Sequence, residues 1–411
     1  MEGDDVQVIV DALAARLGRS VAVDDPSIHL IAASRHFGDE DAARVRSVLD
    51  REVSREIRDW LAVQGVADWT RPARLPGYPR LGIEPRVCVP VRCEGMLLGF
   101  LWLIDGPHRL DDDEIGMAEE AAASVGVILY RRMLLHERER SRAASLLRLL
   151  ISPEADDRRQ AVEELREEQI LTAGDHLIVL VAEVEGESGD PSLALETAAE
   201  HVQRLRPPGS VLMLAQRRRA VVVLTSGHSM TEQTARDLAD RLRSRFAELA
   251  GRDRTAEGTR CLVGISRSRQ GLDTAVEAHR EAVTAARAAR LLPVFGEVAT
   301  WSALGPFAML LRIDIDQLAK QLPLPGIGDL LADPANDVLV TSAERFLDRA
   351  GDVAAAAEAL HVHRTTLYYR LKRIETITGL SMDDGMDRLT LHLAIKLARL
   401  NEGNRSAGGS S

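Results

Sequence analysis

The chain has 411 residues, too many for one ordinary hydrophobic core, so we expect two to four domains. Hydrophobic residues make up 45% and charged residues 28%, a balance that argues against a disordered chain and favours a soluble globular protein. The net charge of −11 argues against a protein that coats nucleic acid along its whole length, but it permits one local basic surface.

The start of the chain and its cysteines indicate a cytoplasmic protein without a metal centre. No stretch of about eighteen uncharged apolar residues is present, as a membrane span would require. Residues 1–5 are acidic where a signal peptide carries basic residues. Cys88, Cys93 and Cys261 are too few for a disulfide framework or a four-thiolate site. We expect no metal and no cofactor.

Residues 1–135 are predicted to form an α/β domain. The expected elements are a helix over Val6–Leu17, a strand over Ile28–Ala32, a helical stretch over Val45–Leu61, and strands over Arg86–Arg92 and Leu97–Asp105. Glu94-Gly95 would join the last two strands in a hairpin, and a helix follows the acids of 111–114. This order resembles a GAF-type sensor domain. Candidates for its ligand pocket are Arg86, Cys88, Arg92 and Trp102.

The helix that leaves this domain is expected to run from Ile115 to beyond Arg140. Its apolar residues recur at steps of three and four, as in a coiled-coil seam: Ile115, Ala118, Ala122, Val125 and Leu129. Two interpretations remain open at this point. The helix packs on its own sheet with a solvated far end, or it dimerises and carries a signal to the rest of the chain. We expect a helical linker over 136–169.

Residues 170–300 are predicted to form a second α/β domain. The expected elements are strands over Leu177–Val184, Ala220–Thr225 and Cys261–Ser266, with helices over Leu193–Leu205, Thr231–Leu249 and Leu272–Ala289. The alternation of strands and helices, with a final strand–helix pair, resembles a GGDEF-like cyclase fold.

Cyclase chemistry is not supported by the residues of this domain. A diguanylate cyclase needs carboxylates for magnesium and a Gly-Gly turn that admits the nucleotide. At the corresponding hairpin this chain has Gln-Arg-Arg-Arg-Ala-Val over 216–221, without those glycines and acids. Glu183 and Glu185 imitate first-strand metal ligands, but surface residues at a strand end are the simpler explanation. We expect no catalytic residues.

Residues 301–400 are predicted to be helical, with a helix-turn-helix core over 341–380. The expected parts are a helix over Thr341–Arg349, a cap at Asp352, a small helix over Val353–Leu360, a turn over His361–His363, and a longer helix from Arg364 to near Gly379. Leu367, Leu371 and Ile374 form one apolar stripe on the longer helix. No acid occurs between Glu358 and Glu375. Helix, short turn and basic helix together predict insertion into the DNA major groove.

The candidate DNA contacts follow from position on this helix. His363 and Arg364 lie at the N-terminal tip and are candidates for base-edge contacts. Candidates for contacts with phosphates or groove walls are Thr365, Thr366, Tyr368, Tyr369, Arg370, Lys372 and Arg373. A solvated helix face is the alternative for each basic residue, and packing on a neighbouring helix is the alternative for Tyr368 and Tyr369.

The stretch from Val353 to Leu380 resembles the C-terminal helix-turn-helix of PucR/CdaR-type regulators, and the segment Arg388–Arg399 extends the match. The resemblance implies an α/β multidomain regulator with GAF-like, GGDEF-like and all-α parts, which binds operator DNA and responds to a small-molecule effector. We expect a homodimer or higher oligomer, because two half-sites multiply affinity. Enzymatic signalling and a helix-turn-helix that only binds protein are the alternatives. The Gly/Ser-rich tail over 401–411 is expected to be disordered.

Overall fold

The computed structural model describes residues 4–38, 41, 53–105, 109–186, 189–251, 259–312 and 325–408. The chain divides into two units, Met1–Ser141 and Arg142–Ser411. Each contains a β-sheet with packed helices, and the second ends in a group of helices, so the expected α/β multidomain class is confirmed. Within the described ranges, no helix is both long and apolar enough to span a bilayer.

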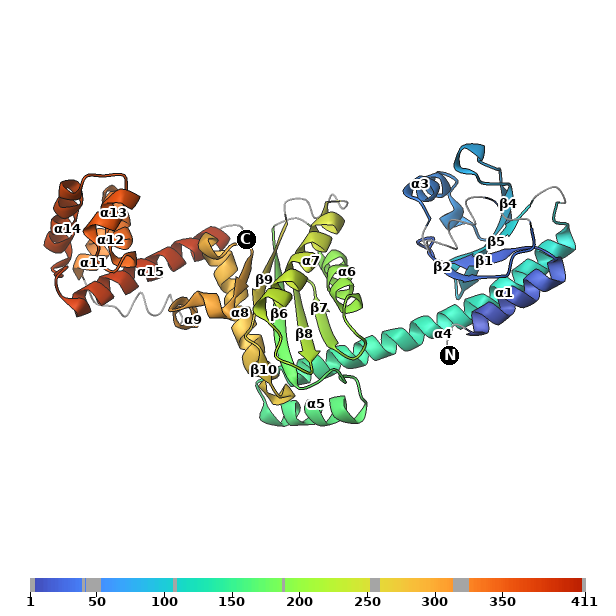
Figure 1. Ribbon diagram of the computed structural model, residues 1–411, viewed down its shortest axis with the longest axis horizontal. Coiled ribbons are helices and arrows are strands. Elements are labelled where there is room, and N and C mark those ends of the chain that lie inside the picture. The colour runs from blue at the N-terminus through green and yellow to red at the C-terminus, as the bar shows by residue number, and fades with distance from the viewer. Residues whose placement is uncertain are drawn as a thin grey trace. The chain divides into compact units, whose positions relative to one another are not determined.

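Unit 1 is built on a five-stranded antiparallel sheet with the order β2-β1-β5-β4-β3 (Figure 1). Its elements are α1 (Asp4–Leu17), β1 (Val21–Asp24), β2 (Leu30–Ala33), α3 (Arg55–Val63), β3 (Ala73–Leu75), β4 (Arg86–Cys93), β5 (Met96–Ile104) and the start of α4 (Asp112–Leu150). The expected hairpin is present as β4 and β5, and Glu94 and Gly95 both have positive φ, at 50° and 78°. That conformation matches the right-handed twist of the flanking strands.

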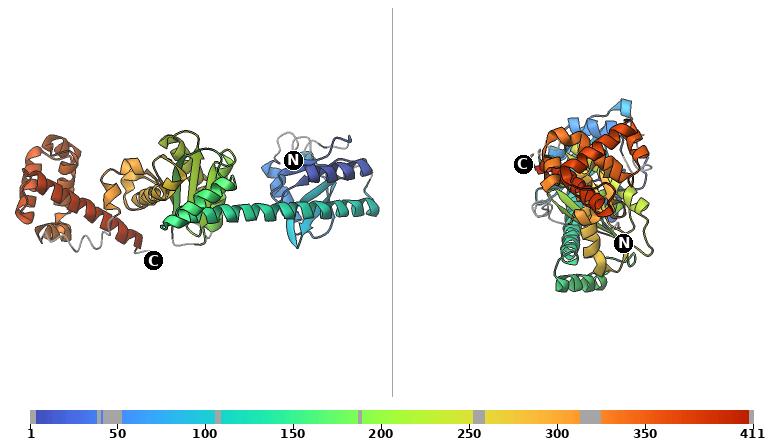
Figure 2. Two further views of the ribbon diagram at one scale, coloured as in Figure 1. Left: turned by 90° about the horizontal axis from the view of Figure 1, so that it is seen from below. Right: turned by 90° about the vertical axis from the view of Figure 1, so that its left-hand side faces the viewer.

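The two faces of this sheet are covered differently. The helices α1 and α4 lie along one face (Figures 1 and 2). The core on that face contains side chains such as Val10, Val87 and Val125. The other face packs against α3 through Leu61 and carries the large side chain of Trp102. Of the expected helical stretch over 45–61, residues 45–52 lie outside the described residues, and the rest corresponds to α3.

The first turns of α4 pack on the sheet of unit 1. Ala118, Ala122 and Val125 are buried in its core, and Ile115 and Leu129 are partly buried beside them. The predicted seam therefore faces the sheet of its own subunit, which favours the first of the two interpretations for this stretch. The helix continues to Leu150, ten residues beyond Arg140.

Unit 2 contains a six-stranded sheet with the order β11-β9-β6-β8-β7, and β10 pairs with β6. Its strands are β6 (His176–Glu185), β7 (Val211–Gln216), β8 (Arg219–Ser226), β9 (Arg260–Ile265), β10 (Arg269–Gln270) and β11 (Val298–Thr300). Its helices after α4 are α5 (Ala155–Glu167), α6 (Ser192–Arg204), α7 (Glu232–Ala250), α8 (Ala275–Leu291), α9 (Phe307–Leu310), α11 (Pro325–Ala332), α12 (Asp337–Asp348), α13 (Val353–Ala359), α14 (Arg364–Thr378) and α15 (Gly385–Gly408). Because α15 ends at Gly408, most of the tail expected to be disordered is helical.

The central strand β6 is buried on both faces. Ile178 and Leu180 point toward the core shared with α6 and α7, whereas Leu177 and Val179 point toward the core shared with α8. The period of two along a strand explains this division, and it explains why the segment reads as a continuous apolar run. The helical segments expected to form a linker contribute Leu146, Leu147, Leu150, Ala161 and Leu165 to the second core.

The helix α8 lies very close to β9. A Cβ atom at Gly264 would overlap the carbonyl oxygen of Ala282 and the amide nitrogen of Ala286. The alanines of α8 and the absent side chain at Gly264 therefore allow backbone to contact backbone.

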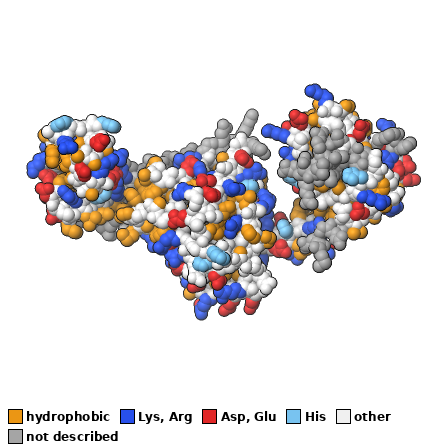
Figure 3. Space-filling view, viewed as in Figure 1, with side chains coloured by type: hydrophobic (Ala, Val, Ile, Leu, Met, Phe, Trp, Pro, Cys, Tyr) orange, Lys and Arg blue, Asp and Glu red, His pale blue; other side chains and the backbone are white. Residues whose placement is uncertain are grey.

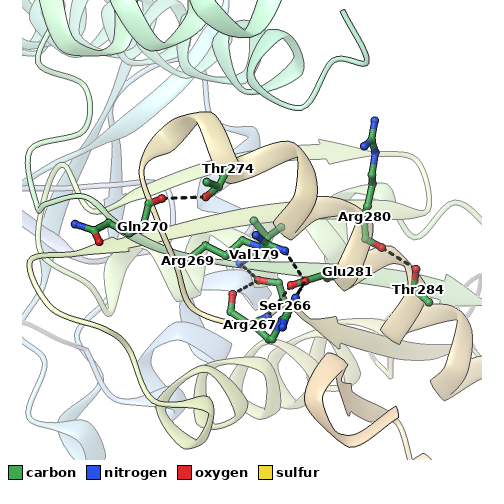
Figure 4. A network of polar contacts seen from close by, with 9 residues as sticks. All are labelled: Val179, Ser266, Arg267, Arg269, Gln270, Thr274, Arg280, Glu281 and Thr284. Carbon is green, nitrogen blue, oxygen red and sulfur yellow. Dashed lines mark hydrogen bonds and ion pairs between the residues drawn. The ribbon is translucent and has the colours of Figure 1, made fainter. Parts of the chain in front are cut away.

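A buried carboxylate joins α8 to the segment that follows β9 (Figure 4). Glu281 is 2% exposed, and it accepts hydrogen bonds from the backbone and guanidinium of Arg267 and from the guanidinium of Arg269. Ser266 accepts from the backbone N–H of Val179 at 2.9 Å, which holds the same segment on β6. Burial raises the pKa of Glu281, but the two guanidinium partners outweigh it and hold that pKa below its usual range.

His279 on α8 makes the stability of unit 2 depend on pH. Burial, aided by the positive charges of Arg219 and Arg280, lowers its pKa from 6.5 to about 4. The unfolded chain therefore binds the proton first, so stability is complete above pH 6.5 and falls as the pH drops toward 4. We expect a loss of roughly 2 kcal/mol between pH 7.5 and pH 5 from this group. Urea unfolding at both pH values checks this, with His279→Gln expected to remove that part of the pH dependence. An unchanged pH profile in the variant would contradict it.

Candidate nucleic-acid interface

The C-terminal helices form a small core of their own. Leu367, Leu371 and Ile374 on α14 are buried in it, as the predicted stripe requires, and Ala356 and Ala357 on α13 lie against them. The alanines have little side-chain volume, so they let α13 approach α14 closely. The core fixes which side of α14 faces outward.

The small helix α13 begins with the predicted cap. The carboxylate of Asp352 accepts hydrogen bonds from the backbone N–H groups of Ala354 and Ala355, at 2.8 and 3.0 Å. These two donors have no partner inside the helix, and the carboxylate also suits the positive end of the helix dipole.

We expect Asp352→Ala to destabilise α13 by about 1 kcal/mol, because both capped N–H groups lose their acceptor. Amide hydrogen exchange in α13 should then accelerate about five-fold. Asp352→Asn is the matched control, since asparagine caps about as well as aspartate. Equal acceleration in both variants would show that the cap itself does not stabilise the helix.

The turn between α13 and α14 is tight. His361 has a φ of 52°, and Val362 donates its backbone N–H to the carbonyl of Ala357 at 3.0 Å. His363 caps α14 by accepting from the N–H of Thr365 at 3.4 Å. His361 is thus a turn residue, as the sequence indicates, and the turn sets the direction in which α14 leaves.

The outward side of α14 carries most of the predicted contact residues. Those that are exposed are His363, Arg364, Thr365, Thr366, Tyr368, Tyr369, Lys372 and Arg373. Tyr368 and Tyr369 are 60% and 74% exposed. Neither residue is therefore buried against a neighbouring helix, which is the alternative to DNA contact for these two tyrosines. Figure 3 shows Lys and Arg side chains along the outer edge of this part of the chain. We call these eight residues the α14 face.

Arg370 differs from the other predicted contacts. Its side chain is half-buried, and its Nη1 donates to the hydroxyl of Ser342 on α12 at 3.0 Å. It therefore helps to hold α14 on α12. Lys372 stays outward and lies 3.1 Å from a carboxylate oxygen of Glu375, whose pKa is lowered by the backbone N–H of Met382 and then by Lys372.

A polar network between α12 and α15 has no signal in the local sequence pattern. His392 and Lys396 on α15 contact Asp348, and Lys396 also contacts Glu344 at 2.8 Å. Arg399 lies 3.3 Å from Glu344. The partners are 44 to 55 residues apart, so only the folded chain brings them together. The network fixes α12, and through it Arg370, beneath the α14 face.

The suspected pocket residues of unit 1 divide into two pairs. Arg86 pairs with the buried carboxylate of Asp41, and Arg92 donates to the backbone carbonyls at 67, 69 and 95, so both arginines hold loops. Cys88 and Trp102 instead lie in the apolar cluster beside α3. The indole N–H of Trp102 is fully buried without a hydrogen-bond acceptor among the residues described. Burial, with a smaller contribution from Asp24, raises the pKa of Cys88, so its thiol stays protonated.

The two carboxylates that imitate metal ligands in unit 2 are each paired with an arginine. Glu183 lies 2.6 Å from Arg219, and Glu185 lies 3.0 Å from Arg260. Across the ranges that the structure describes, no group of three or more His, Cys, Asp or Glu side chains is arranged to hold a metal ion.

Comparison with known proteins matches three families along the chain. Residues 5–129 match the GAF domain, residues 157–288 match the GGDEF-like domain, and residues 339–397 match the PucR C-terminal helix-turn-helix domain. The last match includes all of α12, α13 and α14 except the first two residues of α12.

Three curated relatives are similar over most of the chain. The DNA-binding transcriptional activator AdeR of Bacillus subtilis is 21% identical, covering 97% of this chain and 94% of the relative. The proline-responsive transcriptional activator PutR of the same organism is 20% identical, covering 96% and 97%. The carbohydrate diacid regulator of Escherichia coli is 22% identical, covering 77% and 80%. With matches to the GAF, GGDEF-like and PucR helix-turn-helix domains in this order, the chain is similar to the PucR/CdaR-type transcriptional regulators.

Proposed function

We propose that this regulator reads a specific DNA sequence through the α14 face. The observation that carries the proposal is an exposed helix with three basic side chains and two tyrosines, fixed from behind by a buried apolar stripe. Arg364 at the first turn is placed for a bidentate contact with a guanine edge. Tyr369, Lys372 and Arg373 lie farther along the helix and suit phosphates, which set the register.

Selection from random-sequence DNA with the full chain tests this proposal. We expect enrichment of a motif with two related half-sites, since two copies of the chain would each present one α14. Binding to that motif should weaken steeply between 50 and 200 mM salt, because phosphate contacts release counterions. Failure to enrich any motif, with binding to all DNA equally, would contradict sequence-specific recognition.

We propose that the active form is a homodimer or higher oligomer in the cytoplasm. Past the residues that pack on the sheet of unit 1, α4 carries Leu134 and Leu135 at 39% and 45% exposed. A second copy of the same helix would cover such side chains. Sedimentation of the full chain checks the oligomeric state.

The domain boundaries we propose are 1–135, 136–169, 170–300 and 301–400.

We propose that a small organic metabolite binds in the GAF domain and controls DNA binding. The buried, unpartnered indole N–H of Trp102 supports this location, because an uncompensated polar group in an apolar cluster is costly. The names of two relatives refer to proline and to carbohydrate diacids, which supports a metabolite as the class of effector. A thermal-shift screen of metabolites tests the proposal, with Trp102→Phe expected to weaken the hit.

We propose that the protein is not an enzyme. The arginines that pair with Glu183 and Glu185 leave these carboxylates poorly suited to hold magnesium. Incubation of the purified chain with GTP and magnesium should yield no cyclic product. A cyclic dinucleotide in that assay would restore the enzymatic alternative.

A further inference from the structure

A hollow of about 350 Å³ lies at the turn between β7 and β8. The turn consists of Arg217 and Arg218, since Gln216 and Arg219 pair as the last residues of the two strands. The lining residues are Glu183, Val184, Glu185, Gln216, Arg217, Arg218, Arg219 and Arg290. We call this group the arginine hollow. Its four arginines face two glutamates, so the lining carries an excess of positive charge.

The glutamates do not neutralise this excess. Glu183 is already paired with Arg219, and Glu185 is paired with Arg260, which is not part of the lining. The guanidinium of Arg218 donates to the carbonyl oxygens of Gly186 and Gly189, at 2.6 and 3.4 Å. These carbonyls are neutral, so they orient the guanidinium without neutralising its charge themselves.

Arg290 and Arg217 are only loosely paired. The Nε of Arg290 is shielded from solvent and lacks a hydrogen-bond partner in the described structure, with the nearest carboxylate oxygen, on Glu185, 3.8 Å away. Arg217 lies 3.8 Å from a carboxylate oxygen of Asp190, and both of these side chains are largely exposed. An exposed ion pair at this distance contributes little to stability, so Arg217 can leave Asp190 and contact a ligand at a small cost in free energy.

His279 on α8, outside the lining, is affected by the positive charge of Arg219. Burial is the largest cause of its lowered pKa, and the charge of Arg219 is the next. The positive charge of Arg219 therefore still affects the imidazole of His279, although Arg219 is paired with Glu183.

We propose that the arginine hollow binds a small anion with two or more linked phosphate groups. Guanidinium groups form paired, planar hydrogen bonds with phosphate oxygens, and two consecutive arginines on a tight turn present two such groups side by side. The volume of the hollow suits a diphosphate with room for part of an attached nucleoside. This site shares no residue with the apolar cluster around Trp102 or with the α14 face, so its failure would leave the proposed function untouched.

Calorimetric titration of the full chain at constant ionic strength tests the proposal. The probes are pyrophosphate, GTP, ATP, orthophosphate and citrate. We expect saturable binding of pyrophosphate or of a nucleotide, with orthophosphate and citrate at least about ten-fold weaker. Tight nucleotide binding with weak pyrophosphate binding would assign the attached nucleoside a contact in the hollow. Citrate binding as tightly as pyrophosphate would overturn the proposal, because it would reveal a non-specific anion surface.

Variants locate the site on the chain. Arg217→Gln with Arg218→Gln should weaken binding by about ten-fold or more, because both guanidinium forks are lost. Arg159→Gln on α5 is the matched control, since its side chain is 75% exposed, as Arg217 is at 76%. Equal losses in the double variant and the control would overturn the proposal.

A second readout does not depend on the folding of a variant. A bound anion near Arg219 should raise the pKa of His279, which NMR of its imidazole protons measures in the unaltered chain. Saturating pyrophosphate that leaves this pKa unchanged would place the anion elsewhere and overturn the assignment.

Discussion

Replacement of Arg364 by alanine is expected to reduce affinity for the selected DNA motif by about ten- to a hundred-fold. This range corresponds to the roughly 1–3 kcal/mol by which a bidentate arginine discriminates a guanine from other bases. Affinity for random DNA should fall far less, because Arg364 at the tip of α14 would contact a base edge and not the backbone. The variant therefore loses specificity as well as affinity. Fluorescence anisotropy with both DNAs at one salt concentration measures the two losses.

Arg373→Ala provides the contrasting case on the same helix. For this variant we expect a similar loss of affinity for the motif and for random DNA. The slope of the logarithm of the binding constant against the logarithm of the salt concentration should be smaller by about 1, because one phosphate contact is removed. Arg159→Ala, on α5, is the control for the loss of one exposed arginine, and it should bind like the unaltered chain. If Arg364→Ala bound the motif as tightly as the control, the α14 face would not be the recognition surface.

The helix-turn-helix was predictable because its signals are local. A capping aspartate at 352, a glycine at 379 and an apolar stripe on one helix each act within a few residues, and the structure has all three in the expected roles. The outward direction of a side chain follows from the same helical period. The neighbours of a side chain do not follow from that period, which is why the hydrogen bond from Arg370 to Ser342 on α12 was not predicted.

Elements stabilised by distant partners were missed. The strand β1 is only four residues long, and it is a strand because Val21 and Val23 pair with β5, about eighty residues later. The helix α11 is likewise short, and Gly326 within it lies against the backbone of Ile377 on α14. Short segments have too little periodic pattern to predict by themselves.

The GGDEF-like unit shows how a fold persists when the residues of a reaction are absent. Alternating apolar residues in β6, such as Leu177 and Ile178, specify which side of the sheet each helix covers. This pattern could be predicted from the sequence, and it does not depend on the residues of the turn, Arg217 and Arg218. A turn can therefore change from glycines to arginines without disturbing the core, and the chemistry available at the turn changes with it.

The second large effect is expected at Glu281, the buried carboxylate between Arg267 and Arg269. Its side chain is 3% exposed, whereas those of the arginines are 54% and 26% exposed. Glu281→Gln keeps the shape but removes the negative charge, so the partly buried Arg269 is left without a counter-charge. Loss of one partner from a buried pair costs about 3 kcal/mol or more. We expect the free energy of unfolding of unit 2 to fall by about that amount in urea unfolding followed by circular dichroism.

Glu248→Gln separates burial from the mere presence of an ion pair. Glu248 pairs with Arg245 at 2.9 Å on the surface of α7, where its side chain is 59% exposed. Its replacement should change the stability by less than about 1 kcal/mol, because water already solvates the largely exposed carboxylate of Glu248. Faster hydrogen exchange in β9 and α8 should accompany Glu281→Gln alone. Equal stability of the two variants would mean that Glu281 does not hold α8 on the sheet, and that the close contact at Gly264 is sufficient to do so.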